Sequence, residues 1–434
     1  MISVRVFYRG IERLGSMAYQ VLSLLFLVGA IVLGFTKKLN VGIVSIGLAF
    51  ILGLISGVDT NVILSGFPSK LFMTLLGTMF FFCLLQENHT LELLSRKMVA
   101  VVGKKTFLIP IIIYVVSYVL SAAGPGAISV QSVMIIFAVS LSVQMHASPI
   151  LMGSMAILGA VGGTASPIAL SGIIVTDLTK EMGMTGVATP VFIGVSVANL
   201  ICAIILYIVF KGYKMTAEEI SDKEELPKFN RSQIICIIAL LVLIVAVVVF
   251  RHDVGLVSFA LTFILLFFGV VNEKAAIKLI PWSVLLLISG VSILMAVTKE
   301  LGGITLLSDL LASLMNQFTV SPIIGLSAGL MSWFSSANGV VLPTLIPTAA
   351  DIAANVGGNV TALELIMAIV GGSTVAGISP LSTGGSLILA SYAQETNASD
   401  KDQQMIFGKL FGVSFGAVMI VVIFALVGGF KLFC

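Results

Sequence analysis

Long apolar runs without a charged residue recur from one end of this sequence to the other. No Asp, Glu, Lys or Arg occurs between Thr106 and Met145, or between Leu310 and Ala350. Many runs approach the about 20 residues that a helix needs to cross a bilayer. Only 10% of the residues are charged, against about 25% in a typical soluble domain. Because the runs are continuous rather than alternating, they predict an all-α polytopic membrane protein and not a β-barrel.

The start of the chain and its cysteines exclude some other arrangements. The first apolar run, residues 17–35, is too long for the core of a removable signal peptide, so we interpret it as the first span. Cys83, Cys202, Cys236 and Cys434 are scattered, without a CxxC motif or a Cys/His cluster. We therefore expect neither disulfides nor a metal centre. The net charge of +3 gives no indication of nucleic-acid binding.

The sequence repeats itself at an offset of 213 residues, without a gap from about residue 45 to 172. The matched pairs include Ser166-Pro167 with Ser379-Pro380, Pro68 with Pro281, Glu87 with Glu300, Gly126 with Gly339, Gly159 with Gly372, and Gly172 with Gly385. The long hydrophilic segment 211–232 lies between the two copies. We therefore divide the chain into an interfacial segment 1–16, a first repeat 17–210, a cytoplasmic linker 211–232 and a second repeat 233–434.

Each repeat is predicted to contain the same elements. The first has spans near 17–35, 41–57 and 71–86, an interfacial helix 87–103, a hairpin 106–145, a broken span 150–176 and a last span 188–210. The second has spans near 233–250, 254–271 and 282–298, a hairpin 310–350, a broken span 363–391 and a last span 405–430.

The two hairpins are predicted to be re-entrant. Their turns, SAAGPGA (121–127) and FSSANGVV (334–341), are short and neutral, unlike loops that emerge into water. Backbone of this kind survives at membrane depth only where protein or a wet cavity surrounds it. The alternative is two full spans joined by a short turn. With five crossings and one re-entrant hairpin each, two similar halves must be inverted relative to one another, as in many secondary transporters.

The distribution of positive charge predicts the orientation. Fifteen of the 23 Lys and Arg residues fall on the side of the central linker. By the positive-inside rule, the linker is cytoplasmic and both termini lie outside. Arg5, Arg9 and Arg13 count against this orientation, because they place three positive charges near the opposite side.

Four polar, glycine-containing segments interrupt the apolar runs: SAAGPG (121–126), GGTASPIALSG (162–172), SSANG (335–339) and GISPLSTGG (377–385). Pro167 and Pro380 lack the N–H that continues a helix, and nearby glycines allow sharp turns. Freed carbonyls and hydroxyls suit a small hard cation such as Na⁺, and a half-helix that begins after a break attracts an anion. In the second repeat, Gly377 and Ser379 would face the cation, and Thr383–Ser386 the anion. The alternative is that small residues only allow close helix packing.

Ionisable residues are few within the predicted spans. Glu87 and Glu300 match across the repeat, but they lie at span ends, where a capping role is the alternative to proton binding. A cation/proton antiporter needs a carboxylate buried at a break, and none of the four segments contains one. A membrane-embedded hydrolase is a more distant alternative, because the chain has no HExxH motif and no paired intramembrane aspartates. We therefore do not expect an enzyme.

SSANGVVLPTLIP (335–347), ISPLSTGGSLILAS (378–391) and GTASPIALSG (163–172) resemble the divalent anion/sodium symporter family of the ion transporter superfamily. The similarity is greatest to its bacterial malonate and dicarboxylate carrier branch, and it covers nearly the whole chain. It implies a homodimer in the lipid bilayer, with a scaffold region and a transport region that moves as an elevator. Tip SAAGPG departs from the family pattern because it lacks Asn and Thr.

The resemblance also implies the residues of the site. Those implied for a carboxylate substrate are Ser121, Gly124, Ser166, Pro167, Ser336, Asn338, Ser379, Pro380 and Thr383. Those implied for Na⁺ are Ala122, Gly163, Thr164, Ser166, Ser335, Asn338, Gly377, Ser379 and Ser382. The sequence thus predicts a secondary transporter of the cytoplasmic membrane for a small di- or polycarboxylate, with Na⁺ as the coupling ion and no other cofactor. The choice of carboxylate, Na⁺ against H⁺, and symport against exchange stay open.

Overall fold

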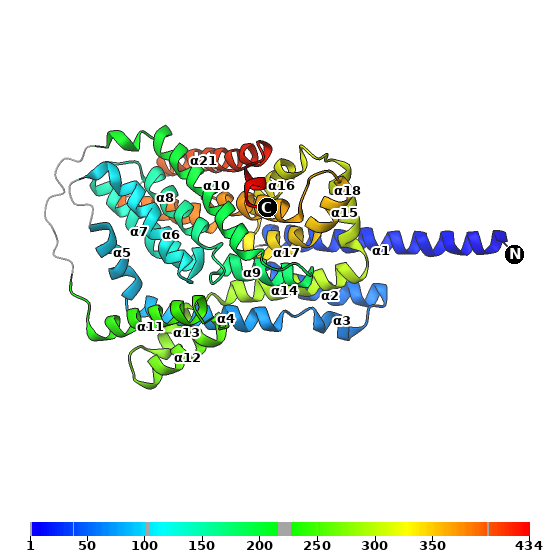
Figure 1. Ribbon diagram of the computed structural model, residues 1–434, viewed down its shortest axis with the longest axis horizontal. Helices are drawn as coiled ribbons and strands as arrows, with labels where there is room; N and C mark the ends of the chain where they lie inside the picture. The colour runs from blue at the N-terminus through cyan, green and yellow to red at the C-terminus, as the bar shows by residue number, and fades with distance from the viewer. Residues whose placement is uncertain (1, 38, 101–104, 216–226, 251, 397–398) are drawn as a thin grey trace.

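The computed structural model describes residues 2–37, 39–100, 105–215, 227–250, 252–396 and 399–434. Within these ranges every regular element is a helix (Figure 1). Eight stretches of the described residues are long and apolar enough to cross a membrane. They are Met17–Gly34, Thr60–Glu87, Gly126–Val143, Ala188–Val209, Trp282–Glu300, Ala337–Val356, Ala362–Ala393 and Lys401–Leu426. The prediction of an all-α polytopic membrane protein is confirmed.

One layer of the molecule joins helices from both halves of the chain. Its members are α1 (Ile2–Lys37), α2 (Val41–Ser56), α3 (Thr60–Ser65), α4 (Ser69–Glu87), α11 (Arg231–Val248), α12 (Val254–Phe267), α13 (Glu273–Leu279), α14 (Trp282–Glu300) and α15 (Gly303–Ser313). Side-chain caps set where several of these helices begin. The Asn40 side chain accepts a hydrogen bond from the Gly42 N–H at the start of α2, and Asp253 accepts one from Leu256 at the start of α12.

This first layer contains two close contacts that mirror each other. A Cβ on Gly290 of α14 would lie 2.0 Å from the carbonyl oxygen of Gly42 in α2. A Cβ on Gly77 of α4 would lie 2.4 Å from the carbonyl oxygen of Gly255 in α12. Gly42 and Gly77 are each 213 residues before Gly255 and Gly290. The two halves therefore exchange equivalent contacts, each one between a helix of the first half and a helix of the second.

The second layer contains the hairpins and the broken spans. Its members are α5 (Thr90–Ala100), η1 (Thr106–Leu108), α6 (Ile109–Ala122), α7 (Gly126–Gln144), α8 (Pro149–Gly163), α9 (Leu170–Glu181), α10 (Ala188–Val209), η2 (Gly212–Lys214), α16 (Val320–Phe334), η3 (Ala337–Val341), α17 (Leu342–Leu345), η4 (Ile346–Thr348), α18 (Ala349–Val356), α19 (Ala362–Val375), η5 (Ala376–Ile378), α20 (Thr383–Thr396), α21 (Asp400–Leu426) and η6 (Gly429–Phe433). Most of the buried apolar side chains form one large core in this layer. A smaller core lies among α1, α2, α3 and α14.

Helix starts recur at the offset of 213 residues that the sequence predicts. The pairs are α2 with α12, α3 with α13, α4 with α14, α5 with α15, α8 with α19, and α9 with α20. The second hairpin differs from the first, because α7 is one helix of 19 residues and its counterpart is divided among η3, α17, η4 and α18. Pro343 and Pro347 explain the division, since each removes a backbone donor, and the first hairpin has Val130 and Met134 there.

One predicted boundary is wrong. The second hairpin was expected to occupy residues 310–350, but residues 303–313 form the separate helix α15, and the first arm begins only at Val320. The end of α15 carries no charge after Asp309, so it could not be told from the hairpin by charge alone. The first hairpin, predicted at 106–145, agrees with η1, α6 and α7.

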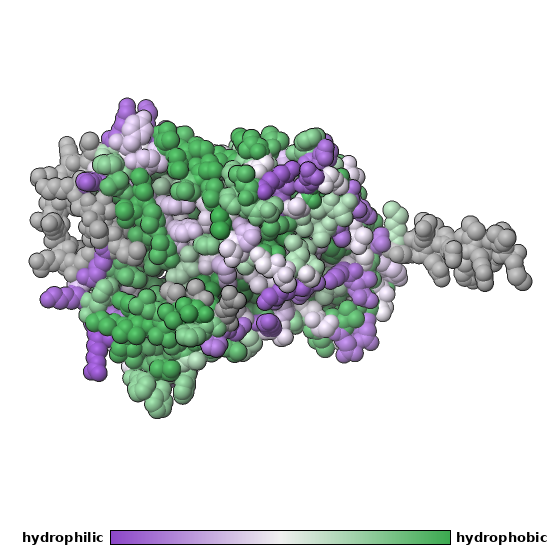
Figure 2. Space-filling model, in the orientation of Figure 1, coloured by the Kyte–Doolittle hydropathy of each residue, from purple (hydrophilic) through white to green (hydrophobic). Residues whose placement is uncertain are grey.

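The surface of the protein is apolar over broad areas. Figure 2 shows apolar residues over α10 and over α11–α13, with hydrophilic residues mainly toward the two ends of the long axis. Exposed apolar side chains on these helices include Ile193, Leu200, Ile204, Ile208, Ile238, Leu241, Leu256, Phe263, Phe267 and Phe268. An apolar belt between polar ends is what a bilayer requires of the protein it surrounds.

Several predicted segments fall at the margins of the described residues. Of the linker 211–232, residues 216–226 lie outside the described part, as do residues 101–104 at the end of the expected interfacial helix 87–103. Residues 2–16 continue into α1 without a break, and their interfacial placement stays a prediction.

Candidate functional site

The first arm of each hairpin runs parallel to the first half of its broken span. Cβ atoms on Gly159 and Gly163 of α8 would lie 2.2 and 2.3 Å from the carbonyl oxygens of Tyr114 and Tyr118 in α6. A Cβ on Gly372 of α19 would likewise lie 2.2 Å from the carbonyl oxygen of Gly325 in α16. These glycines allow backbone-to-backbone contact. Because the paired helices advance together, each pair ends at the same level.

Two helix ends therefore meet at each break. We call residues 121–126 tip 1, residues 164–169 break 1, residues 335–341 tip 2 and residues 376–382 break 2. Helices α6 and α8 end at tip 1 and break 1, and α16 and α19 end at tip 2 and break 2. C-terminal helix ends carry partial negative charge and free carbonyls, which favour a cation. Helices α9 and α20 begin just beyond, and their N-terminal ends favour an anion.

Break 1 is a tight turn held by its own backbone. The N–H of Ser166 donates to the Gly163 carbonyl at 2.9 Å, and the N–H of Gly172 donates to the Thr164 carbonyl at 3.1 Å. A Cβ on Gly172 would lie 2.0 Å from the Ser166 carbonyl oxygen, so α9 folds back directly onto the break. Ser166 is buried and Pro167 is exposed.

Break 2 repeats this turn and adds a hydroxyl. The N–H of Ser379 donates to the Ala376 carbonyl at 2.9 Å, and a Cβ on Gly385 would lie 2.2 Å from the Ser379 carbonyl oxygen. The Ser382 hydroxyl lies within hydrogen-bond distance of both the Gly377 and the Ser379 carbonyl oxygens. Three oxygens predicted to hold Na⁺ are thus brought together. Break 1 has Ala169 at the position of Ser382.

Tip 1 is fastened to the end of α8. The Ser121 hydroxyl is buried and donates to the Ala160 carbonyl at 2.6 Å, so it satisfies a free carbonyl in the last turn of that helix. Gly124 has φ of 135° and Gly126 has φ of 72°, values that favour glycine. A Cβ on Gly124 would meet the Phe82 ring of α4 at 2.7 Å. Tip 1 offers no hydroxyl or amide other than Ser121, and Ala122 contributes only backbone.

Tip 2 contains a π-helical turn. The Ser336 hydroxyl accepts a hydrogen bond from the Gly339 N–H at 3.1 Å, and the Val340 N–H donates to the Ser336 carbonyl at 2.9 Å. The Ser335 hydroxyl donates to the Met331 carbonyl at 2.7 Å, at the end of its own helix α16. The turn places Asn338 in the interior, where it is only 9% exposed. Wide turns of this kind are frequent at functional sites.

A hydrogen bond between the two halves connects tip 2 with the start of α9. The Ser171 hydroxyl donates to Asn338 Oδ1 at 2.7 Å, and the Thr164 hydroxyl oxygen lies 3.4 Å from that of Ser171. Ser171 was not predicted as a site residue. The sequence paired tip 2 with break 2 of its own half, and no local pattern marks a partner 167 residues away. A serine in the first turn of a half-helix that follows a break was the one available signal.

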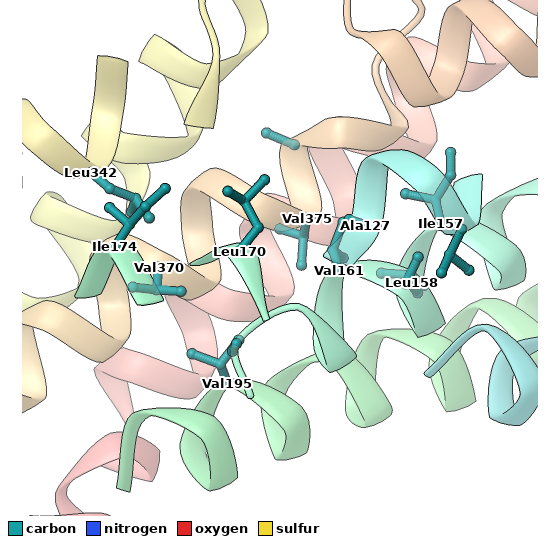
Figure 3. Close-up of a cluster of buried hydrophobic side chains, with 14 of the residues drawn as sticks. Ala127, Ile157, Leu158, Val161, Leu170, Ile174, Val195, Leu342, Val370 and Val375 are labelled. Carbon is teal, nitrogen blue, oxygen red and sulfur yellow. The ribbon is translucent and has the colours of Figure 1, made fainter. Parts of the chain in front are cut away.

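Apolar contacts from both halves surround this hydrogen bond. Figure 3 shows Ile174 of α9 beside Leu342 of α17, with Val370 of α19 close to both. Leu170, Ala127 and Val375 lie nearer the centre of the same cluster. All six side chains are buried. The four predicted segments therefore belong to one core in which the two halves interleave.

Two other predicted residues lie at the start of α20. Pro380 is buried, and Thr383 is exposed at the first position of the helix. The Ser379 hydroxyl accepts a hydrogen bond from the Leu381 N–H at 3.3 Å. The helix therefore begins where the sequence predicted it, and its first N–H groups lie beside the break.

The carboxylates lie away from the breaks. Glu364 is buried in the first turn of α19, about 18 Å from break 2 at 1.5 Å per residue. The Ser321 hydroxyl donates to Glu364 Oε1, and Glu364 Oε2 has no hydrogen-bond partner among the described residues. Glu87 and Glu300 end α4 and α14, as expected of interfacial residues. No group of three His, Cys, Asp or Glu able to hold a metal occurs in the described ranges.

One cavity of about 670 Å³ lies outside the candidate site. Gln86, Glu87, His89, Glu92, Val133, Asn272, Lys274, Ala275, Lys278 and Leu279 line it. None of these residues belongs to a tip or a break. The cavity therefore adds nothing to the site described above.

These features define a class of protein, a multi-pass helical membrane transporter. The fold is similar to the crystal structure of the Alcanivorax borkumensis YdaH transporter, which is described as having an unusual topology. The TM-score is 0.55 and the sequence identity 11%, over 85% of this chain and 89% of that chain. At this identity the likeness concerns the fold alone.

A second comparison concerns the sequence. Residues 17–164 match the family described as Dicarboxylate carrier protein MatC N-terminus. The resemblance to dicarboxylate carriers that the sequence predicted is confirmed over this part, which ends inside break 1. The match indicates a carrier and not an enzyme, and the two findings together support a secondary transporter. A search of curated proteins gives no match.

Proposed function

We propose that this protein is a secondary active transporter that moves a small di- or polycarboxylate across the cytoplasmic membrane, driven by Na⁺. The observation that carries the proposal is the meeting of paired helix ends at each break. Two C-terminal ends give a cation a partly negative surroundings, and the N-terminal ends of α9 and α20 give an anion a partly positive one. The family match in residues 17–164 supports the carboxylate class.

The absence of basic side chains from these segments favours co-transport with a cation. No Lys or Arg occurs in residues 106–179, and none occurs in residues 301–400. A dicarboxylate carries two negative charges, and each helix end contributes only about 0.3–1 kcal/mol, up to about 2 kcal/mol where partly buried. Co-bound Na⁺ would supply the missing positive charge. The Gly377 and Ser379 carbonyls with the Ser382 hydroxyl are the oxygen cluster best suited to it.

The two layers support an elevator mechanism. The first layer has its own core among α1, α2, α3 and α14, which suits a fixed scaffold. The second layer holds both tips and both breaks around the large core, so it would move as one body with substrate and ion. We further propose a homodimer with both termini outside and the linker cytoplasmic. The arms α6 and α16, of 14 and 15 residues, reach only about 21–23 Å and suit re-entrant hairpins.

Uptake into liposomes tests the function. Purified protein should accumulate labelled malonate, succinate or citrate only with an inward Na⁺ gradient. Asn338→Ala and Ser379→Ala should each reduce uptake without loss of folded protein. Na⁺-independent uptake at every pH would exclude Na⁺ coupling, and unchanged uptake in both variants would remove the proposed site.

The second candidate is coupling to protons. It requires a titratable group at a break, and among the described residues none lies there. The buried carboxyl of Glu364 is the observation that keeps this candidate under consideration, because Oε2 has no partner. Uptake driven by a pH gradient in Na⁺-free buffer, and lost in Glu364→Gln, would favour protons over Na⁺.

A further inference from the structure

The three polar side chains that meet across the two halves form a small buried cluster. Thr164 and Ser171 are fully buried and Asn338 is 9% exposed. The Ser171 hydroxyl has one proton and donates it to Asn338 Oδ1 at 2.7 Å. The Thr164 hydroxyl is 3.4 Å from the Ser171 oxygen, so Thr164 is the donor across that distance. The cluster fixes the position of the Asn338 side chain.

Fixing Asn338 leaves donors free at the same place. Among the described residues no acceptor faces Asn338 Nδ2, although the side chain is nine-tenths buried. The backbone N–H of Ser171, in the first turn of the 12-residue helix α9, has no acceptor there either. Buried donors are normally satisfied. An amide N–H₂ and a helix N-terminus side by side suit one carboxylate.

The equivalent place in the other half has no polar side chain. Residues 213 positions after Thr164 and Ser171 are Gly377 and Gly384, and the residue 213 positions before Asn338 is Pro125. A Cβ on Gly384 would lie 2.8 Å from the Gly377 carbonyl oxygen, so backbone occupies the space of the hydroxyls. Helix α7, which follows Pro125, packs against α20. Only the N–H groups at the start of α20 remain as donors.

We infer that the site holds the two ends of its substrate unequally. One carboxylate binds at Thr164, Ser171 and Asn338, and the other end meets only backbone N–H groups at the start of α20. The inference rests on the proposed function and adds a specificity to it. A cluster of dedicated donors rejects a group that cannot accept their hydrogen bonds, whereas a helix N-terminus accepts any oxygen. The substrate class is therefore a small acid with one required carboxylate and one replaceable end.

Competition against labelled malonate tests the inference. Malonamate and monomethyl malonate, which keep one carboxylate, should compete within about tenfold of malonate itself, since a helix N-terminus adds only modest charge-dependent affinity. Malonamide, which has none, should not compete. If both half-blocked acids fail to compete at a hundredfold excess over effective malonate, the two ends are recognised alike and the inference is wrong. If malonate itself is not transported under any gradient, the proposed function fails instead.

Ser171→Ala tests the assigned end. Loss of the hydroxyl should raise the half-maximal concentrations of malonate and malonamate by the same factor, about tenfold, because both place a carboxylate in the cluster. Ser154→Ala is the matched control, since Ser154 is a buried α8 serine without a hydrogen-bond partner among the described residues. Unchanged values in Ser171→Ala overturn the assignment. Should that variant not fold, competition on the unmodified protein still decides the inference.

Discussion

Break 1 and break 2 have nearly the same backbone, but their hydroxyl groups lie in different places. In each, a glycine of the following half-helix touches the carbonyl of the Ser-Pro serine, at Gly172 and Ser166 and at Gly385 and Ser379. Break 1 carries Thr164 and Ser171, whose hydroxyls lie toward tip 2 of the other half. Break 2 has glycine at both positions and instead carries Ser382, whose hydroxyl faces its own loop.

This difference separates two requirements of a transporter site. The shared backbone supplies helix ends, which act on ions of either sign without regard to side chains. The side chains then make the two breaks unlike, with donors for an anion at break 1 and an additional oxygen for a cation at break 2. The predictions that follow test first what the breaks share and then what distinguishes them.

The largest effect is expected where the breaks are alike. Gly172→Ala and Gly385→Ala each place a Cβ about 2 Å from a backbone carbonyl oxygen, at 2.0 and 2.2 Å, so the half-helix must move away from its break. Each should cost about 3 kcal/mol of stability or more and abolish measurable uptake. Thermal unfolding in detergent and uptake into liposomes measure both. Gly408→Ala, with nothing within 4 Å, is the control. A normal Gly385→Ala protein beside an inactive Gly172→Ala protein would show that only break 1 matters.

The next effect distinguishes the breaks by their cation oxygens. Ser382→Ala removes the hydroxyl that bridges the Gly377 and Ser379 carbonyls, so the Na⁺ concentration for half-maximal uptake should rise about tenfold. Competition by half-blocked acids should stay unchanged. Ala169→Ser places the same hydroxyl in break 1 and serves as the reciprocal variant. If Ser382→Ala leaves the Na⁺ dependence unaltered, break 2 does not hold the coupling ion through this hydroxyl.

A smaller effect is expected at the start of the helix that leads into break 2. Glu364 of α19 corresponds to Leu151 of α8. Glu364→Ala leaves the buried Ser321 donor without its acceptor and should cost about 1–3 kcal/mol in thermal unfolding. Glu364→Gln keeps an acceptor and should retain stability, Na⁺ dependence and the pH profile of uptake. A pH profile flattened by Glu364→Gln would instead assign this carboxyl to proton coupling.

The smallest effect concerns the half-helix after break 1. Burial raises the pKa of Asp177 in α9, against the lowering influence of Lys70 and Lys180, and α20 has Ala390 there. A raised pKa means that the folded state binds the proton more tightly, so its stabilising contribution is present at low pH and is lost as pH rises through the folded pKa. Asp177→Asn should therefore be more stable near pH 7, by less than about 1 kcal/mol because the group is half exposed.

The difference between Asp177→Asn and the unmodified protein should shrink as pH falls toward the ordinary Asp value of 3.8. Thermal unfolding at several pH values measures it. Lower stability of Asp177→Asn at neutral pH would mean that the contact with Lys70 outweighs burial. Ala390→Asp supplies the converse variant in α20.

The offset between the halves shows how far sequence reasoning reached into the fold. The matched Ser-Pro pairs, and Gly172 with Gly385, located both breaks, and the helices that follow begin at Leu170 and Thr383, 213 residues apart. Reasoning from charge failed at residues 310–319, because the end of α15 is as neutral as the hairpin that follows it. The Ser382 hydroxyl was found because its acceptors lie five residues away or closer.

The sequence by itself determined the membrane class, the two halves and the positions where helices stop and restart. These features depend on the hydropathy of runs and on Gly and Pro acting over a few residues. The tertiary structure alone decided that Ser171 donates to Asn338 and that Ser121 holds tip 1 to α8. Such contacts depend on which helix faces cross, and packing sets these faces among residues far apart in the chain.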